Sequence, residues 1–458
     1  MIDLFLFEMI KKNSKVIIYG LGDMGSSYID QIETSNWCEI VAVSDQKEIE
    51  TSYKYIRPEE LKTQKDYDYL VIAIESLTIA NQVYQTMLSL GVPGSKIVNL
   101  NMRYGEFPSS NKVTYQNEKL QITIIEGGGF GDALMDMVFI NRLKELLEDK
   151  CEILFCCRTS EYFKKFSAID EVIQHPDSEQ EMKEIRERSE DLTFIMHSMA
   201  LVHKFNKEKV RAVSEVVYRY CEDCIHMQKV LFDNAINNFR ITKYGVVLGK
   251  NRIEHPDLHG ILGVSRYSKL DIPAEKSDTY SRTIANLLNK KYITINRDTG
   301  SDSGVHPKLW PMAYYQELLK MIKAAYPEIA IVFVGKAQKE LVPFLDLNLA
   351  GKTSLQEVEV LLRNALLHIG GEGGMVHLMH FLGGRSMVFF GPTDYRVFGY
   401  PENINLYSDV CDERCAWITE KWADSCLKGD AEPECMRAIY PQMAFDAFRD
   451  YIDRLNVF

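Results

Sequence analysis

The segment 364–400 constrains the fold of this chain more than any other part of it. An apolar run, Ala365–Ile369, breaks at two glycines; Glu372 and two further glycines then lead into a helical run that carries His377. A second apolar run, Ser386–Phe390, ends in a Gly-Pro-Thr-Asp turn. Unpaired N–H groups and the positive end of a helix attract anions, and glycine lets the backbone come close to them. The segment therefore predicts two neighbouring strands whose ends form a phosphate-binding mouth.

Length and charge set the broad class of the protein. At 458 residues the chain is long enough for two or three domains, and no apolar run approaches the ~20 residues of a membrane span. The amino terminus, 1–13, lacks the features of a secretory signal, so we expect a short amphipathic helix there. The net charge of -12 argues against general nucleic-acid binding, because nothing in the charge balance would neutralise phosphates along a strand.

The first segment, 1–112, has the pattern of a Rossmann-like domain. An apolar strand ends at Gly20, and Gly22 and Gly25 complete a Gly-x-Gly-x-x-Gly motif before a helical run. Asp45 lies at the end of the next strand. The arrangement predicts a site for a nucleotide or NAD(P), with Asp45 accepting hydrogen bonds from a ribose. The alternative is a domain of the same shape in which the glycines only make the turn and Asp45 caps the next element.

Two further α/β segments follow a polar stretch, 107–119, that predicts a linker. The second segment, 113–288, starts with a strand, a glycine-rich loop and a long helix, and a basic helical stretch is expected from Leu201 to about Asn234. The third segment, 289–458, alternates strands and helices and contains the phosphate-binding mouth. Two such halves predict facing Rossmann-like domains with a cleft between them. The amphipathic final helix, Gln442–Leu455, is expected to pack back across this cleft.

Three motifs within residues 120–439 carry a family resemblance. Gly131-Asp132 precedes a long helix, Lys308 precedes a Trp-Pro pair, and the loop 372–377 is followed downstream by Gly-Pro-Thr-Asp. In these motifs the chain resembles the bacterial heptosyltransferases, family 9 of the glycosyltransferases. The resemblance implies the α/β GT-B fold for this part of the chain, and the Rossmann-like domain expected in 1–112 is an additional amino-terminal domain.

The resemblance also implies a role for each motif residue in sugar transfer from a nucleotide-diphosphate donor. Asp132 would be the base that takes the proton of the acceptor hydroxyl, although alone it has the pattern of a plain helix cap. Lys308 and the backbone amides of Gly373 and Gly374 would stabilise the charge on the departing diphosphate. Further candidates for donor or substrate contact are Gly131, Glu372, His377, Thr393 and Asp394. Without the resemblance, Lys308 would be interpreted as a surface lysine and His377 as a core or capping histidine.

The donor loop departs from the family pattern. Glu372 stands where the family has an aspartate, and Gly373 stands where it has a threonine. The longer acid and the missing hydroxyl leave the donor sugar open, so ADP-heptose is one candidate among several nucleotide sugars. The 1–112 segment is not part of the minimal family enzyme, and it loosely resembles domains attached to enzymes of surface-polysaccharide synthesis.

Four cysteines fall within one short segment near the carboxyl terminus: Cys411, Cys415, Cys426 and Cys435. Four thiols in a short stretch suit a tetrahedral structural zinc site, and some members of the resembled family carry cysteine-bound iron there. Zinc and iron are therefore both candidates, and the alternative is four reduced thiols packed in a small lobe. Ten cysteines without an export signal indicate a reducing compartment, and we expect a cytoplasmic protein.

The favoured function is an inverting glycosyltransferase that moves a heptose or related sugar to a surface glycan or a protein acceptor. Two alternatives stay open. One is a degenerate GT-B protein that serves as a nucleotide-sugar-binding or scaffold subunit, and the other is an NAD-dependent sugar-modifying module in the 1–112 segment. We expect no nucleic-acid partner and no transmembrane segment, while peripheral membrane association and a homo-oligomer are compatible with the sequence.

Overall fold

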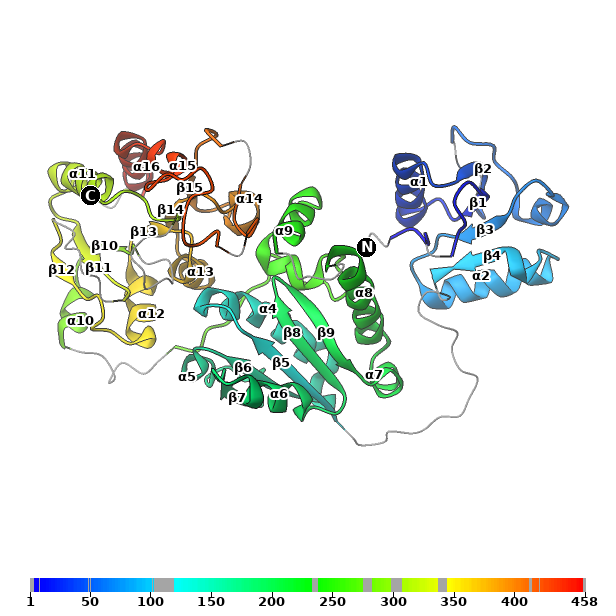
Figure 1. Cartoon of the computed structure of the whole chain (residues 1–458), viewed down its shortest axis with the longest axis horizontal. Helices are drawn as coiled ribbons and strands as arrows, with labels where there is room; N and C mark the ends of the chain where they lie inside the picture. The colour runs from blue at the N-terminus through cyan, green and yellow to red at the C-terminus, as the bar shows by residue number, and fades with distance from the viewer. Residues whose placement is uncertain are drawn as a thin grey trace. The chain divides into compact units, whose positions relative to one another are not determined.

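The computed structural model divides the chain into two compact units (Figure 1). One unit is Met1–Thr114 with His259–Ile261, and the other is Tyr115–Leu258 with Leu262–Phe458. Of the expected linker 107–119, only Lys119 belongs to the described residues, and the rest lies outside them. The structure describes residues 4–7, 9–47, 49, 51–100, 102, 119–232, 238–274, 282–297, 307–336, 344–411, 414–419 and 421–455.

The amino-terminal unit is built on a parallel sheet with the strand order β2-β1-β3-β4. Its strands are short apolar runs, as expected where helices cover a parallel sheet, and their side chains form the core of the unit. This is the Rossmann-like domain predicted from the sequence. Its elements are β1 (Lys15–Tyr19), α1 (Asp23–Ser35), β2 (Glu39–Ser44), η1 (Pro58–Thr63), β3 (Tyr69–Ile72), α2 (Leu77–Ser89), η2 (Gly94–Lys96) and β4 (Ile97–Asn99).

The amphipathic helix predicted at the amino terminus is wrong for the residues that the structure describes there. Residues 4–7 and 9–14 form turns and bends without a helical segment. Phe5 is fully buried, its ring meets the ring of Tyr28 edge-on at 5.4 Å, and its amide donates to the side-chain oxygen of Gln31 at 2.7 Å. Phe5 is buried because it packs on α1. The spacing of apolar residues that predicted an amphipathic helix therefore results from this tertiary contact.

The first half of the second unit is a sheet with the strand order β7-β6-β5-β8-β9. All pairs are parallel except the last, in which β9 runs antiparallel to β8. The strands are β5 (Leu120–Glu126), β6 (Cys151–Cys157), β7 (Glu171–Gln174), β8 (Leu192–His197) and β9 (Met199–Phe205). The helices are α4 (Phe130–Leu147), η3 (Glu148–Lys150), α5 (Ser160–Phe163), α6 (Glu179–Arg188), α7 (Lys207–Val213), α8 (Glu215–Phe232), α9 (Asn238–Val247) and η4 (Arg252–Asp257).

The helix predicted to begin at Leu201 begins later in the chain, because β9 occupies this position. The chain reverses at Ser198, whose φ of 61° is in the left-handed region. Leu201 then pairs with Ile195 across the resulting hairpin. Pairing between β8 and β9 is a tertiary contact that the local sequence does not indicate. Basic residues continue from β9 into the following helices, so the local pattern placed the helix start too early.

The second half is a parallel sheet with the strand order β12-β11-β10-β13-β14-β15. Its strands are β10 (Tyr292–Ile295), β11 (Ala330–Phe333), β12 (Leu347–Asn348), β13 (His368–Gly371), β14 (Ser386–Phe389) and β15 (Ile404–Leu406). The helices are α10 (Arg282–Leu287), α11 (Met312–Ala325), α12 (Leu355–Asn364), α13 (Gly374–Phe381), α14 (Tyr395–Phe398), α15 (Glu434–Arg437) and α16 (Pro441–Arg454). Ser354 caps α12, because its hydroxyl accepts from the amide of Glu357.

The core of the second half explains where the last helix lies. Trp310 is 1% exposed, stacks on Phe389 at 4.1 Å and donates from its indole to the carbonyl of Ile439 at 2.8 Å. Phe448 and Ile452 of α16 join the same core, and α16 packs against α11. The prediction that this helix crosses the cleft is therefore wrong, since its apolar face is buried against its own half.

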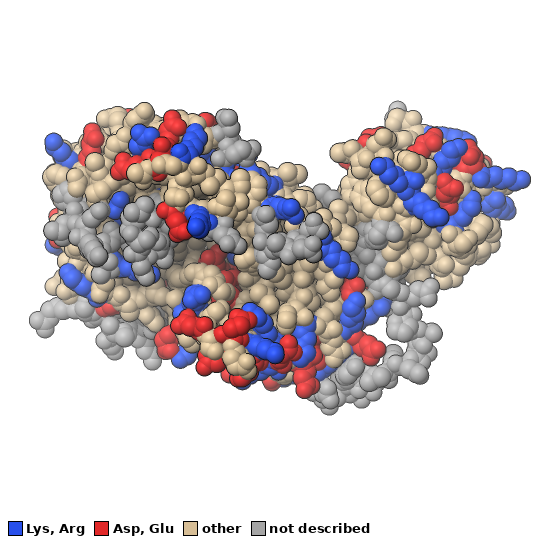
Figure 2. All heavy atoms as spheres, in the orientation of Figure 1, with Lys and Arg blue, Asp and Glu red and all other residues tan. Residues whose placement is uncertain are grey.

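Among the described residues, no helix is long and apolar enough to cross a membrane. Lysine and arginine side chains are interspersed with aspartate and glutamate over much of the face shown in Figure 2. The net charge of -12 is therefore not gathered into a single acidic patch on this face.

Candidate functional site

The two motif loops of the second unit meet at a pair of glycines. Gly131 lies at the start of α4 and Gly374 at the start of α13, each just after the carboxyl end of a parallel strand. A Cβ on Gly131 would come within 2.9 Å of the Cα of Gly374 and within 2.8 Å of a ring carbon of His377. A Cβ on Gly374 would in turn lie 3.2 Å from the amide nitrogen of Gly131. Close approach of the two helix starts therefore requires glycine at both positions.

Asp132, the predicted base, lies beside this contact on α4. Its Oδ2 accepts from the amide of Gly129 at 3.2 Å, which is the capping interaction of an acidic residue in the first helical turn. Its Oδ1 lies 3.5 Å from the guanidinium of Arg252, and its side chain remains 41% exposed. One carboxylate oxygen is thus tied to the helix, while the group as a whole stays accessible.

A buried polar cluster lies behind Asp132, and the sequence analysis missed it. Arg252 is 2% exposed, and its guanidinium donates to Asp136 at 3.2 Å as well as reaching Asp132. Glu126, at the end of β5, is 3% exposed and accepts a hydrogen bond from the amide of Gly128. Burial, and then the charge and hydrogen bond of Asp136, raise the pKa of Glu126 well above its ordinary value.

Lys308 and the donor loop form a second connected set. The ammonium of Lys308 lies 2.6 Å from Glu372, whose other oxygen lies 3.5 Å from Nε2 of His377. Nδ1 of His377 is 2.7 Å from the hydroxyl of Tyr400, a residue that the sequence analysis did not single out. Burial opposes ionisation of Glu372, but the charge of Lys308 and the hydrogen bond of His377 outweigh it, so the pKa of Glu372 is lowered.

The helix start next to this set is suited to bind an anion. Gly373 precedes α13 and provides no side-chain cap, and Lys308 is held beside it by Glu372. The ammonium also lies 5.4 Å from the ring centroid of Trp422, in a cation–π contact. A cation and the positive end of a helix thus occupy one site.

Thr393 and Asp394 follow β14 and are almost completely buried. Asp394 caps α14 by accepting from the amide of Arg396 at 2.9 Å, and it also pairs with the Arg396 guanidinium. Burial opposes its ionisation, but these interactions with Arg396 prevail and lower the pKa of Asp394. The hydroxyl of Thr393 is buried and has no hydrogen-bond partner within the described structure. Both carboxylate oxygens of Asp394 are thus engaged by Arg396, whereas the hydroxyl of Thr393 is not engaged by any described residue.

The glycine motif of the amino-terminal unit makes the turn between β1 and α1. Gly20 has a φ of 95°, which disfavours any other residue, and a Cβ on Gly25 would collide with the carbonyl oxygen of Gly20. Both carboxylate oxygens of Asp45 are engaged, with the amide of Leu21 at 2.8 Å and that of Lys47 at 3.2 Å. A Cβ on Gly22 would meet nothing within 4 Å. These contacts match the structural alternative for Asp45, and ligand binding here stays a prediction.

The four clustered cysteines are all reduced and lie close enough to influence one another. Burial and then the charges of Cys411, Cys415 and Cys426 raise the pKa of Cys435 to about 12. Even so, within the described residues no three or more His, Cys, Asp or Glu side chains are arranged to hold a metal ion. The thiols are the right donor set for zinc or iron, but their present spacing is not that of a ligand shell.

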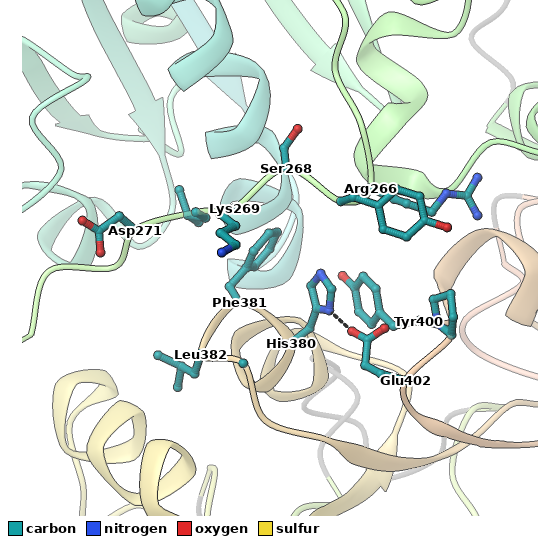
Figure 3. Close-up of a pocket in the computed structure, with 13 residues that line it drawn as sticks. Arg266, Ser268, Lys269, Asp271, His380, Phe381, Leu382, Tyr400 and Glu402 are labelled. Carbon is teal, nitrogen blue, oxygen red and sulfur yellow. Dashed lines mark hydrogen bonds and ion pairs between the residues drawn. The ribbon is translucent and has the colours of Figure 1, made fainter.

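A cavity of about 540 Å³ lies at the other end of α13 (Figure 3). It is lined by residues 266–271, 380–383 and 400–402, and none of the site residues predicted from the sequence is among them. His380 lies flat against Tyr400 at 3.6 Å and bonds to Glu402. Tyr400 connects the cavity with the candidate site, since its hydroxyl meets His377.

Fold and site together define the class of the protein. Two α/β halves built on mainly parallel sheets face each other through the loops after β5 and β13, and a Rossmann-like unit precedes them. This is the GT-B arrangement with an additional amino-terminal domain, and the predicted fold class is confirmed.

Comparisons with known proteins agree with this class. Residues 262–416 match the family described as "Glycosyltransferase family 9 (heptosyltransferase)", and residues 12–98 match the family described as "C2185-like, N-terminal". The first match covers most of the second half and leaves out Asp132. No curated protein matches the chain. The resemblance to the heptosyltransferase family inferred from the sequence is confirmed over residues 262–416, and the protein is a glycosyltransferase.

Several solved structures are similar to the chain, and each match covers 74% of it. A family 9 glycosyltransferase from Veillonella parvula is 13% identical, is covered over 98% of its length and gives a TM-score of 0.46. The E. coli ADP-heptose lipopolysaccharide heptosyltransferase II is 12% identical, with 100% of its length covered and a TM-score of 0.45. The iron-containing dodecameric glycosyltransferase TibC from enterotoxigenic E. coli is 14% identical, with 77% covered and a TM-score of 0.49.

Proposed function

We propose that this protein transfers a sugar, with inversion, from a nucleoside-diphosphate donor to a hydroxyl group of a surface glycan or a protein. The observation that carries the proposal is the contact between Gly131 and Gly374, which brings Asp132 of one half beside the donor loop of the other. An accessible carboxylate and an anion site are the two groups that such a transfer needs.

Asp132 has the role of general base in this proposal. The acceptor oxygen attacks the anomeric carbon, its proton passes to a carboxylate oxygen of Asp132, and the bond between the anomeric carbon and the diphosphate oxygen breaks. Exposure of 41% lets an acceptor reach the carboxylate, while the hydrogen bond from Gly129 fixes its orientation.

Lys308 and the start of α13 have the role of stabilising the departing diphosphate. Negative charge grows on the leaving oxygen as the bond breaks, and a fixed cation with aligned backbone N–H groups lowers the energy of that state. Glu372 holds Lys308 in place at 2.6 Å, and His377 and Tyr400 hold Glu372. Gly373, Thr393 and Asp394 complete the proposed donor side.

A heptose or related sugar is the proposed cargo, and ADP-heptose is one candidate donor. A TibC structure that is 15% identical contains ADP-D-beta-D-heptose. Glu372 points its carboxylate at Lys308 and His377 in this chain. A donor sugar must therefore bind without that carboxylate or compete with Lys308 and His377 for it. Nucleotide sugars other than ADP-heptose thus remain candidate donors.

The remaining parts of the chain have proposed supporting roles. Residues 113–288 form the acceptor domain, 289–458 the donor domain and 1–112 an accessory domain whose ligand could be a nucleotide or NAD(P). The four clustered cysteines provide thiol donors suited to the proposed structural zinc or iron ion. Ten unpaired cysteines support a cytoplasmic location. The proposal also includes assembly into a homo-oligomer and peripheral association with a membrane.

A transfer assay with Asp132→Asn tests the function. Glycosyl transfer from a panel of nucleotide sugars is measured with the wild type, and the variant is expected to lose roughly 10²–10⁴-fold in kcat because it cannot accept the proton. Donor binding, measured by calorimetry, should remain, since Lys308 and α13 are untouched. Glu161→Gln, an exposed carboxylate on the same half, is the matched control and should transfer normally. Normal transfer by Asp132→Asn would overturn the assigned base, and failure of the wild type with every donor would favour a binding subunit.

A further inference from the structure

The carboxyl cluster behind Asp132 is more elaborate than a capped helix start requires. Asp136 lies one turn after Asp132 on α4, Glu126 ends β5, and Arg252 begins η4. Asp136, Arg252 and Glu126 are 0%, 2% and 3% exposed, respectively. Three separate elements thus bring ionisable side chains into the interior directly behind the proposed base.

If every group of the cluster were ionised, two buried carboxylate oxygens would lack a hydrogen-bond donor. Oε2 of Glu126 and Oδ2 of Asp136 are both buried without a hydrogen-bond partner that the described residues provide. The two carboxyls are nevertheless within hydrogen-bonding reach of each other. Two ionised carboxylates would repel at this distance, whereas one proton held between them satisfies both oxygens.

Other groups around the cluster do not supply this proton. His197, at the end of β8, has a lowered pKa because of burial and the charge of Arg252. Burial and the same arginine lower the pKa of His255 to about 3. Burial raises the pKa of the Cys157 thiol to about 12, so it stays neutral. The remaining charged groups that act on Glu126 are therefore Asp132, Asp136 and Arg252.

We propose that Glu126 is a positioning residue that keeps its proton, donates a hydrogen bond to Asp136 and thereby fixes Arg252 between Asp136 and Asp132. The inference deepens the proposed function, because it rests on Asp132 as the base. Arg252 donates to Asp136 at 3.2 Å and reaches Asp132 at 3.5 Å. The two carboxylates therefore share the guanidinium, and the shorter contact is to the buried Asp136. Sharing orients Asp132 while its side chain stays 41% exposed, which suits a group that must accept a proton from an acceptor.

Replacing Asp136 is expected to move Arg252 towards Asp132, and replacing Glu126 is expected to move it towards Asp136. In Asp136→Asn, Arg252 pairs with Asp132 alone, stabilises its ionised form and makes it a weaker base. In Glu126→Ala, Asp136 loses its donor and draws Arg252 away, so the ionised form of Asp132 is less stabilised. Because transfer requires an ionised base, the acidic limb of the pH–rate profile moves to lower pH in the first variant and to higher pH in the second.

The test is the pH dependence of kcat/KM in the wild type, Glu126→Ala, Glu126→Gln and Asp136→Asn. The alanine and the asparagine variant should each lose about tenfold or more at neutral pH, because Arg252 no longer holds Asp132 from its shared position. Their acidic limbs should shift in the opposite directions given above. Glu126→Gln should rescue most of the loss, since glutamine can accept from Gly128 and donate to Asp136 as a protonated carboxyl does. Equal losses in Glu126→Gln and Glu126→Ala, with both folded by thermal unfolding, would overturn the proposal.

Infrared spectroscopy tests the proton independently of transfer activity. The wild type at neutral pH should show the carbonyl band of a neutral carboxylic acid, and Glu126→Gln should lack it. Absence of that band in the wild type would overturn the inference even if transfer occurs. Its presence in a protein that transfers no sugar would support the buried proton while the proposed function fails, which keeps the two failures distinct.

Discussion

At the scale of the residue, removal of the buried Lys308–Glu372 pair should cost considerable stability. Both side chains are largely buried, at 13% and 6% exposed, and the pair is 2.6 Å apart. Glu372→Gln removes the carboxylate that faces this largely buried ammonium, so we expect a loss of roughly 3–5 kcal/mol in the free energy of unfolding. Glu161→Gln, which breaks the exposed pair with Lys164, should cost at most about 1 kcal/mol. Chemical unfolding at pH 7 measures both.

The pH dependence of that loss has a definite sign. The pKa of Glu372 is lowered in the folded protein, so its stabilisation is present above the unfolded pKa and is lost as pH falls towards the folded value. The difference between wild type and Glu372→Gln should therefore be full at neutral pH and narrow below about pH 4.3. A difference that stays constant down to acid unfolding would show that Glu372 contributes by packing and not by charge.

Residues within the motifs could be predicted from the sequence, but their partners could not. Gly131 and the loop 372–377 are visible in the sequence because glycine at a strand–helix junction is typical of a backbone that approaches an anion closely. Arg252 meets Asp136 from 116 positions away, and nothing local distinguishes it from other arginines. Glu126 ends an apolar strand, and the neighbouring sequence does not indicate which groups its carboxyl contacts. Tyr400 likewise has meaning only through His377.

At the scale of the element, the contact between α4 and α13 should respond sharply to one methyl group. Gly131→Ala favours the helix by up to about 1 kcal/mol, yet its Cβ would lie 2.9 Å from the Cα of Gly374, which is backbone and cannot rotate away. We expect a net loss of about 1–3 kcal/mol and a large fall in transfer, because the two helix starts must separate. Gly129→Ala is the matched control, since its Cβ would meet nothing closer than 3.9 Å.

The outcome distinguishes crowding from flexibility at this position. Thermal unfolding and the transfer assay are made on both variants. If Gly129→Ala is as harmful as Gly131→Ala, the loop needs glycine for freedom of motion and the contact with α13 is not the cause. A stable and active Gly131→Ala would mean that the two helix starts do not touch in solution.

Elements were predictable where the local pattern and the tertiary structure agree. Parallel strands buried on both faces are continuous apolar runs, and β1, β5 and β14 were found in this way. The pattern failed at β9, which depends on pairing with β8, and at residues 4–7 and 9–14, where Phe5 packs on Tyr28 of α1. It also failed to place α16, because an amphipathic face does not reveal which surface it covers.

At the scale of the whole molecule, the two compact units should respond to different ligands. Thermal unfolding of the full chain and of a truncated chain, 115–458, is measured across nucleotide sugars and NAD(P). A ligand at a hundred times its dissociation constant adds about 2.7 kcal/mol to the unit that binds it. One nucleotide sugar should raise the midpoint of both chains, because Lys308, the donor loop and Asp132 all lie within the larger unit.

The same experiment separates the proposed transferase from its alternatives. A nucleotide sugar that stabilises only the full chain would place its site in the amino-terminal unit and contradict the donor site proposed at α13. NAD(P) that stabilises only the full chain would instead assign a ligand to the turn at Gly20, where Asp45 is already engaged by Leu21 and Lys47. Such a response would require a ribose to displace two backbone hydrogen bonds from that carboxylate, each contributing about 1 kcal/mol or more.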